Sequence, residues 1–181
     1  MKNSCKIIPE TAMRPNGSIG IEDIISFLKE NSVMVEVGCY YGESTLMWQS
    51  SEKIIKIYAV DPWKDFYDIN DGASQRGNMV EVERLFDENI KNSTKIIKIK
   101  STSVDASKTF EDKSLDFVYL DGSHTYNDLC NDITHWLPKI KKDGIIAGHD
   151  ITWITVKSAV EKYLGKNYRT FSDSSWASVV Q

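Results

Sequence analysis

The sequence contains no apolar run of the length that spans a bilayer, and we recognise no secretory signal in it, so we expect a cytoplasmic protein. A block of basic residues is also missing, since 22 Lys and Arg stand against 26 Asp and Glu, for a net charge of −4. This balance argues against a nucleic acid or an anionic membrane as a partner. Cysteine is scarce, and its wide spacing is typical of reduced thiols rather than of a disulfide framework or a zinc site: Cys5, Cys39 and Cys130.

Repeats, linkers and low-complexity segments are absent as well, so we expect residues 1–181 to form one domain with a substantial core. Residues 1–18 are polar and show no periodicity, which predicts an N-terminal arm that packs on a partner or covers a site. Residues 62–78 are polar and aromatic, and they form a segment longer than a strand and the next helix need to be joined, which predicts a lid loop. The sequence leaves open whether the protein forms a homo-oligomer.

The most informative stretch covers residues 33–45, which we interpret as a buried strand, a glycine turn and the start of a helix. Gly38 and Gly42 allow backbone angles, or a close approach to a ligand, that a side chain would prevent. The free N–H groups of the helix start face whatever lies over the turn. A dinucleotide fingerprint needs a glycine where Glu36 stands, so the pattern is E-x-G-x-x-x-G instead. This stretch predicts a nucleotide site at the carboxyl edge of a parallel sheet.

Strand and helix patterns alternate along the rest of the chain. The predicted strands cover 54–60, 96–99, 115–120 and 145–147, the last preceded by a turn at Asp143 and Gly144. Helical patterns lie between them, and the helix after residue 124 begins with a capping box of Thr125 and Asp128. Residues 168–171 and 176–180 close the chain as a hairpin. This order predicts an α/β fold with one doubly wound, mostly parallel sheet and helices on both faces.

The glycine pattern resembles motif I of class I S-adenosylmethionine-dependent methyltransferases. The stretch 116–126, the stretch 144–150 and the tetrapeptide Val60-Asp61-Pro62-Trp63 are similar to small O-methyltransferases related to macrolide-sugar and cephamycin-pathway enzymes. The resemblance covers the chain from about Glu30 to its C-terminus. It implies a Rossmann-like fold with a seven-stranded sheet of order 3-2-1-4-5-7-6.

The resemblance implies S-adenosylmethionine as the cofactor. Asp61 follows the second strand about 20 residues after the glycine turn, where a carboxylate accepts hydrogen bonds from ribose hydroxyls. The alternative for Asp61 is an ordinary strand end beside a tight turn. Trp63 either flanks the adenine or packs in the core or under the lid. The full set of expected cofactor contacts is Glu36, Gly38, Tyr40, Gly42, Asp61, Trp63, Ser103 and Asp121.

Asp121 ends the fourth strand, and His149 with Asp150 ends the fifth, so we expect the three side chains to converge beside the cofactor cleft. In metal-dependent relatives, including the more distant catechol O-methyltransferase, the matching positions hold a divalent cation. Most relatives have an oxygen ligand where His149 stands, and imidazole suits manganese, iron or zinc better than magnesium. The alternative is a strand-end turn residue at Asp150 and a hydrogen-bonded loop histidine at His149.

His124 follows Asp121 by three residues, the offset at which those relatives carry a catalytic lysine or histidine. A histidine suits proton abstraction because its unperturbed pKa is about 6.5. The alternative is an exposed loop residue. His135 lies in the middle of a predicted helix beside Trp136, which indicates a structural role.

These observations predict an O-methyltransferase that acts on a small-molecule hydroxyl, such as that of a sugar or a glycosylated metabolite. Two alternatives remain. A nucleotide-dependent oxidoreductase would need the missing first glycine, and a non-catalytic cofactor-binding module would need neither His124 nor the cation.

Overall fold

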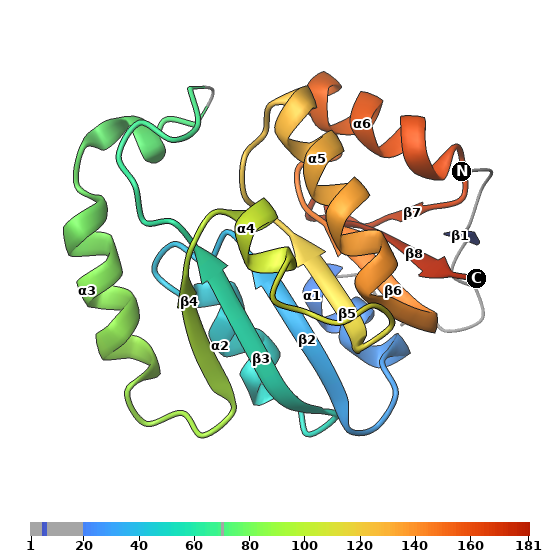
Figure 1. Cartoon of the computed structure of the whole chain (residues 1–181), viewed down its shortest axis with the longest axis horizontal. Helices are drawn as coiled ribbons and strands as arrows, with labels where there is room; N and C mark the ends of the chain where they lie inside the picture. Colours follow the sequence, from blue (N-terminus) through green and yellow to red (C-terminus); the bar gives the residue numbers. More distant parts are fainter. Residues whose placement is uncertain (1–4, 7–19, 70) are drawn as a thin grey trace.

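The fold is built around one twisted β-sheet (Figure 1). Its strands follow the order β1-β8-β6-β5-β2-β3-β4, and β7 is also paired to β8. The computed structural model describes residues 5–6, 20–69 and 71–181. Its strands are β1 (Cys5–Lys6), β2 (Ser32–Val37), β3 (Ile54–Asp61), β4 (Ile96–Lys100), β5 (Leu115–Leu120), β6 (Ile140–Gly148), β7 (Arg169–Thr170) and β8 (Trp176–Val180). Without β1, this arrangement is the predicted order 3-2-1-4-5-7-6, which is confirmed.

The strand β1 was not predicted. Residues 5–6 belong to the segment expected to be an arm, yet Cys5 pairs antiparallel with Val180 at the end of β8. β7 pairs with the beginning of the same strand. The other residues of the predicted arm, 1–4 and 7–18, lie outside the described residues.

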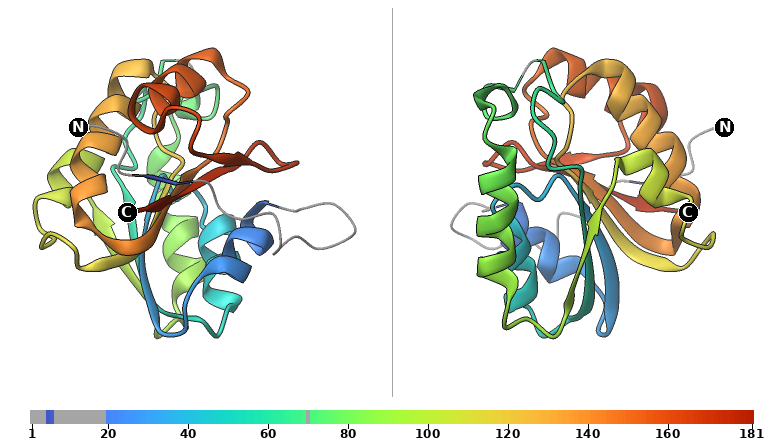
Figure 2. Two further views of the ribbon diagram at one scale, coloured as in Figure 1. Left: turned by 90° about the vertical axis from the view of Figure 1, so that its right-hand side faces the viewer. Right: turned by 60° about the vertical axis from the view of Figure 1, so that its left-hand side comes forward.

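Helices cover both faces of the sheet, as predicted, and Figure 2 shows the two groups on opposite sides. The alternation of side chains along β2 explains this, because Met34 packs with one helix group and Val35 with the other. One face carries α1 (Gly20–Phe27), α2 (Glu43–Ser50) and α3 (Met79–Ile90), and the other carries α4 (Ser103–Ser107), α5 (Tyr126–Trp136) and α6 (Ile154–Leu164). In the described part of the chain, no helix has both the length and the apolar character that a membrane span requires.

After β4, the Thr102 hydroxyl accepts a hydrogen bond from the Asp105 N–H at 3.3 Å and caps the short helix α4. One predicted boundary was wrong. β6 begins at Ile140, before the turn predicted at Asp143 and Gly144, because a register shift accommodates the left-handed Asp143 within the strand. A Cβ on Gly144 would lie 2.7 Å from the Asp116 carbonyl oxygen.

The predicted start of α5 is confirmed. The Thr125 hydroxyl accepts a hydrogen bond from the Asp128 N–H at 3.2 Å, so the capping box fixes where the helix begins. This end of α5 directly follows residues 121–124, so the cap also fixes the path of the segment that leaves β5.

Candidate active site

A cavity of about 430 Å³ opens at the carboxyl ends of β2, β3, β5 and β6. Ligands bind at this edge in doubly wound folds because loops and helix starts converge there. Its wall comes from the glycine turn after β2, the predicted lid, the start of α4, the first turns of α5 and the residues that follow β5 and β6. The structure therefore brings the segments singled out in the sequence to one place.

Gly38 closes the turn after β2 with a φ of +85°, which a side chain rarely adopts. A Cβ at this position would lie 2.0 Å from the carbonyl oxygen of Asp121. Gly42 has a φ of +88° and stands directly before α2. Gly38 lines the cavity, whereas Gly42 does not and is packed against Phe86 instead.

Glu36, an expected cofactor contact, is fully buried and lies behind the cavity wall rather than on it. Its carboxylate accepts hydrogen bonds from the Thr45 hydroxyl and from Trp48 Nε1, both on α2. Burial raises the pKa of Glu36 to about 7, although the bonds from the side chains of α2 oppose the shift. Glu36 therefore fastens α2 to β2, and the sequence could not show which way its side chain points.

Asp61 ends β3 on the cavity wall, but its carboxylate already serves the protein. Oδ2 accepts the backbone N–H groups of Cys39 at 2.9 Å and Tyr40 at 3.1 Å, and Oδ1 accepts that of Trp63 at 2.7 Å. Burial raises the pKa of Asp61 above its usual range, although these three N–H groups oppose the shift. Asp61 thus joins the glycine turn to β3, and part of its acceptor capacity remains for a ligand.

The other expected cofactor contacts divide between the wall and the core. Tyr40 and Ser103 line the cavity, and the Ser103 hydroxyl accepts a hydrogen bond from Trp136 Nε1 at 2.9 Å. Trp63 lies in the core, 4% exposed, with its ring 4.8 Å from that of Phe86. Its Nε1 donates to the Tyr40 carbonyl at 3.0 Å, so Trp63 stabilises the glycine turn from the core.

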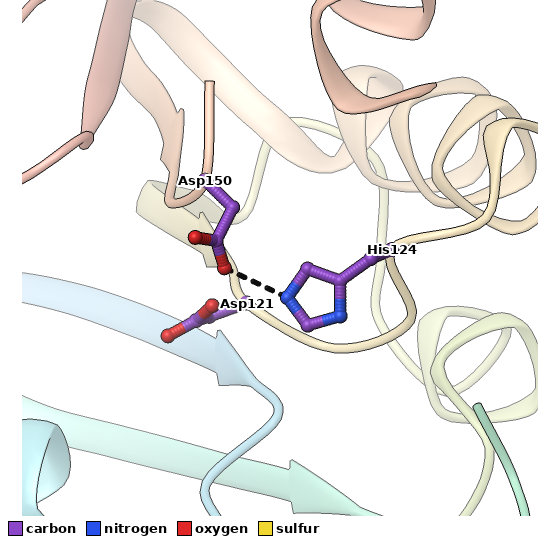
Figure 3. A group of neighbouring side chains, drawn as sticks. All are labelled: Asp121, His124 and Asp150. Atoms are coloured by element: carbon purple, nitrogen blue, oxygen red, sulfur yellow. Dashed lines mark hydrogen bonds and ion pairs between the residues drawn. The ribbon is translucent and has the colours of Figure 1, made fainter. Parts of the chain in front are cut away.

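Asp121, His124 and Asp150 form a tight group, each offering an atom within 4.8 Å of the others (Figure 3). The set of three predicted for a cation has His149 where this group has His124. His149 remains close, since its Nδ1 lies 3.3 Å from Asp150 Oδ2 and 4.0 Å from Asp121 Oδ1. The strand ends therefore gather four ionisable groups at one point.

Two opposing effects set the pKa values in this cluster: burial disfavours the charged form of each group, and attraction between carboxylates and imidazoles favours it. Burial raises the pKa of Asp121 to about 6. Burial would lower the pKa of His124, but hydrogen bonds with Asp150 and Asp68 outweigh it and raise that pKa to about 9. The bond with Asp150 raises the pKa of His149 to about 9, and both histidines hold the pKa of Asp150 far below its usual range. Near pH 7 the two histidines and Asp150 thus form an ion-paired cluster.

Two carboxyl groups at the site were not predicted from the sequence. Asp68 lies in the predicted lid and contacts His124. Asp132 is a buried carboxyl on α5 that lines the cavity, and burial raises its pKa to about 7. No motif contains Asp68, and its partner is 56 residues away. Asp132 follows the capping residue Asp128 by one helical turn, and this spacing was the only available signal.

A family profile described as "Methyltransferase domain" matches residues 35–151, from β2 to the residue after Asp150. An uncharacterized protein, y4gI, from Sinorhizobium fredii (strain NBRC 101917 / NGR234) is 23% identical to this chain over 150 residues. That match covers 78% of this chain but only 15% of the relative's length.

Three solved structures share the fold. A Staphylococcus aureus protein provisionally named a caffeoyl-CoA O-methyltransferase has a TM-score of 0.64 and 13% identity, covering 91% of this chain and 84% of its own. The Streptococcus mutans protein SMU.1697c, provisionally named a methyltransferase and solved in complex with SAH (S-adenosylhomocysteine), has the same TM-score and identity, covering 91% and 99%. A precorrin 8W decarboxylase from Methanobacterium thermoautotrophicum has a TM-score of 0.59 and 16% identity, covering 96% and 95%. At such identities the likeness shows the fold alone.

Proposed function

We propose that this chain, which belongs to the methyltransferase-domain family, uses S-adenosylmethionine to methylate a hydroxyl group of a small molecule. The observation that carries this proposal is the group of Asp121, His124 and Asp150 on the cavity wall. Methyl transfer from a sulfonium is an in-line displacement, so the protein must hold the acceptor oxygen, the methyl carbon and the sulfur in line. A hydroxyl also has to lose its proton, and this cluster supplies groups for that step.

The cofactor belongs on the side of the cavity formed by the glycine turn. Gly38 lines the cavity where its turn packs closely on the backbone of Asp121, and Tyr40 and Asp61 stand on the same part of the wall. Ser103 at the start of α4 gives a polar contact for the far end of the cofactor. With the cofactor there, its methyl group can face the strand ends that carry Asp121 and Asp150.

The charge of the cavity favours a neutral or cationic acceptor. Among the described residues, eight acidic side chains line it, against one lysine and two histidines: Glu43, Asp61, Asp68, Asp71, Asp121, Asp128, Asp132 and Asp150, against Lys64, His124 and His149. A phosphorylated acceptor or a coenzyme A thioester would place further negative charge beside these carboxylates, which is unfavourable in a partly desolvated site. Sugars, amino sugars and uncharged phenols fit this wall better.

We assign the base role to His124. Its imidazole is half-buried on the cavity wall, and its Nε2 lies 2.8 Å from Asp150 Oδ2, facing the cluster (Figure 3). For His124 to accept the proton of the acceptor hydroxyl, Nε2 must be released from Asp150 and carry a lone pair. The proton that the ion pair keeps on His124 must therefore leave to solvent first, because Asp150, whose pKa lies far below its usual range, does not hold it.

The donor set of the cluster fits a divalent cation. Asp121 and Asp150 would supply carboxylate oxygens, and one imidazole, from His149 as predicted or from His124, would supply nitrogen. Such a mixed set suits manganese or iron better than magnesium. When bound, the cation would lower the pKa of the acceptor hydroxyl. Because Nε2 of His124 cannot ligate and abstract a proton at once, we place His149 in the ligand set and keep His124 as the base.

A methyl-transfer screen tests this proposal. The purified protein is given S-adenosylmethionine with a labelled methyl group and acceptors in matched pairs, each a sugar, amino sugar or phenol and its phosphate ester. We expect transfer to the neutral or cationic member of a pair and little to the ester. Chelation should lower the rate, and manganese or iron should restore it at least as well as magnesium. Binding of NADH without binding of S-adenosylhomocysteine would contradict the assignment, and binding without any transfer would favour a non-catalytic module.

A matched pair of variants separates the two histidines. Under the proposal, His149→Ala loses bound manganese in elemental analysis, whereas His124→Ala retains it and loses turnover. The reverse pattern would make His124 the ligand and remove it from the base role.

A further inference from the structure

We propose that Asp68, on the lid, is a positioning residue that fixes the orientation of the His124 imidazole. The proposal rests on the base role of His124 put forward above. Asp68 lies 56 residues before His124 in the chain and is only 3% exposed. Nothing in the sequence patterns connects the two residues.

The contact has two parts that together fix the ring. Asp68 Oδ2 accepts the backbone N–H of His124 at 2.7 Å and lies 2.8 Å from its Nδ1. The first bond holds the main chain of the residue and the second holds one edge of its ring, so rotation about both side-chain bonds is restricted. The remaining nitrogen, Nε2, is thereby directed toward Asp150, 2.8 Å away. The indole of Trp153 lies against the ring, with centroids 4.7 Å apart.

The lid holds Asp68 in place through its own hydrogen bonds. The Asp68 N–H donates to the Ser74 hydroxyl at 2.9 Å, and its carbonyl accepts from Gln75 Nε2 at 2.7 Å. Ser74 is held in turn, since its N–H donates to the Asp71 carboxylate at 3.2 Å. The carboxylate that meets His124 therefore comes from a cross-linked loop and is oriented before any ligand binds.

The consequence is a link between the fold of the lid and the aim of the base. A base must lie within hydrogen-bond reach of the proton it takes, and small displacements reduce the rate strongly. When the lid is folded as observed, the Asp68 carboxylate prevents His124 from turning Nε2 away from the strand ends. The lid thus contributes to catalysis through His124 without itself touching the reacting atoms.

Nuclear magnetic resonance of the imidazole protons tests the contact. The chain has three histidines, so labelling with 15N-histidine and one substitution at a time assigns every ring signal. An imidazole N–H bonded to a buried carboxylate exchanges slowly with water and gives a proton signal downfield of the amides. We expect such a signal on Nδ1 of His124, lost in Asp68→Ala. Asp68→Asn, which has nearly the same shape and keeps an oxygen acceptor, should retain the signal with an upfield shift.

The matched control is Asp65→Ala. Asp65 is also a lid carboxylate, but its Oδ1 accepts the backbone N–H of Met79 at 2.8 Å and it does not line the cavity. This variant should keep the His124 signal. Loss of the signal in Asp65→Ala to the same degree would show that the lid as a whole, and not Asp68, orders the ring. An absent signal in the parent protein, or an unchanged signal in both Asp68 variants, would overturn the proposal.

Kinetics measures what the contact does. With an acceptor from the screen above, kcat should fall about tenfold to a hundredfold in Asp68→Ala and less in Asp68→Asn, as is usual for residues that orient a working group. The Kd for S-adenosylhomocysteine should stay within about threefold, because a positioning role changes turnover rather than cofactor affinity. An unchanged kcat after loss of the signal would refute the positioning role. A parent protein that transfers no methyl group would refute the proposed function, and the resonance alone would then decide whether Asp68 orients the ring.

Discussion

The two sides of the cavity use their acidic residues differently. On the side of the glycine turn, Glu36 and Asp61 accept hydrogen bonds from the chain itself, from α2 and from three backbone N–H groups respectively. On the side of the strand ends, Asp121 and Asp150 face two histidines and each other. The first set builds the shape of the site, whereas the second set is a cluster of ionisable groups.

The difference explains what each side can do. Carboxylates that are satisfied by backbone and helix donors form a rigid frame, and removing one exposes unpaired donors. Carboxylates and imidazoles that satisfy one another can exchange a partner for a ligand, a proton or a cation. We therefore expect substitutions on the strand-end side to affect turnover, and substitutions on the glycine-turn side to affect stability and cofactor affinity.

The largest effect is expected for His124→Ala on the strand-end side. Loss of a positioned base usually lowers turnover by about 10²–10⁴-fold, and cofactor affinity should change little because no cofactor contact is assigned to His124. Steady-state kinetics and calorimetry with S-adenosylhomocysteine measure the two quantities. The control is His135→Gln, a partly buried histidine outside the cavity whose Nδ1 lies 2.7 Å from the Asn131 carbonyl and which should leave turnover unchanged. Turnover of His124→Ala within a few-fold of the parent would place the base elsewhere.

Gly38→Ala tests how tightly the glycine turn after β2 is packed. Its Cβ would lie 2.0 Å from the Asp121 carbonyl oxygen at a φ of +85°, so the turn must move. Strain and overpacking together should lower the free energy of unfolding by about 2–5 kcal/mol, measured by urea denaturation. Gly72→Ala is the matched control, because no atom of the described residues other than those of its chain neighbours lies within 4 Å of its added Cβ. Equal stabilities of the two variants would show that the turn is not tightly packed.

Glu36→Gln tests whether the buried carboxyl group of Glu36 is protonated in the folded protein. The pKa of Glu36 is raised from 4.5 to about 7, so the folded state keeps the proton between these values while the unfolded state releases it. Its contribution to stability is therefore present below about pH 4.5 and lost as the pH rises to about 7. Over that window the parent should lose about 3 kcal/mol relative to Glu36→Gln, because one pKa unit corresponds to about 1.4 kcal/mol. Parallel curves of unfolding free energy against pH for the two proteins would contradict this.

Asp61→Ala should have the smallest effect of the four. It removes the acceptor of three backbone N–H groups and the expected partner of the ribose, so binding of S-adenosylhomocysteine should weaken by about 1–3 kcal/mol in calorimetry. Turnover at saturating cofactor should fall far less than in His124→Ala. If Asp61→Ala lowered turnover more than it weakened cofactor binding, the proposed difference between the glycine-turn side and the strand-end side would be wrong.

Most of the fold followed from the sequence because its signals are local. The alternation of apolar residues, the glycines at 38 and 42 and the capping box at Thr125 each act over a few residues, and all lie where predicted. The carboxyl ends of parallel strands share one edge, so the meeting of Asp121 with Asp150 also followed from strand order. The strand β1 did not follow, because two residues acquire strand structure only through pairing with Val180 at the other end of the chain.

Only the tertiary structure decided the direction of individual side chains. Glu36 and Trp63 belong to motifs at the site, yet both turn inward because donors and aromatic rings from other elements receive them there. Asp68 belongs to no motif, yet it reaches His124 because the lid folds over the strand ends. A periodic pattern specifies which element a residue occupies, but its partner depends on packing between segments distant in sequence. Long-range hydrogen bonds and burial therefore determine which polar residues form the frame and which remain available for chemistry.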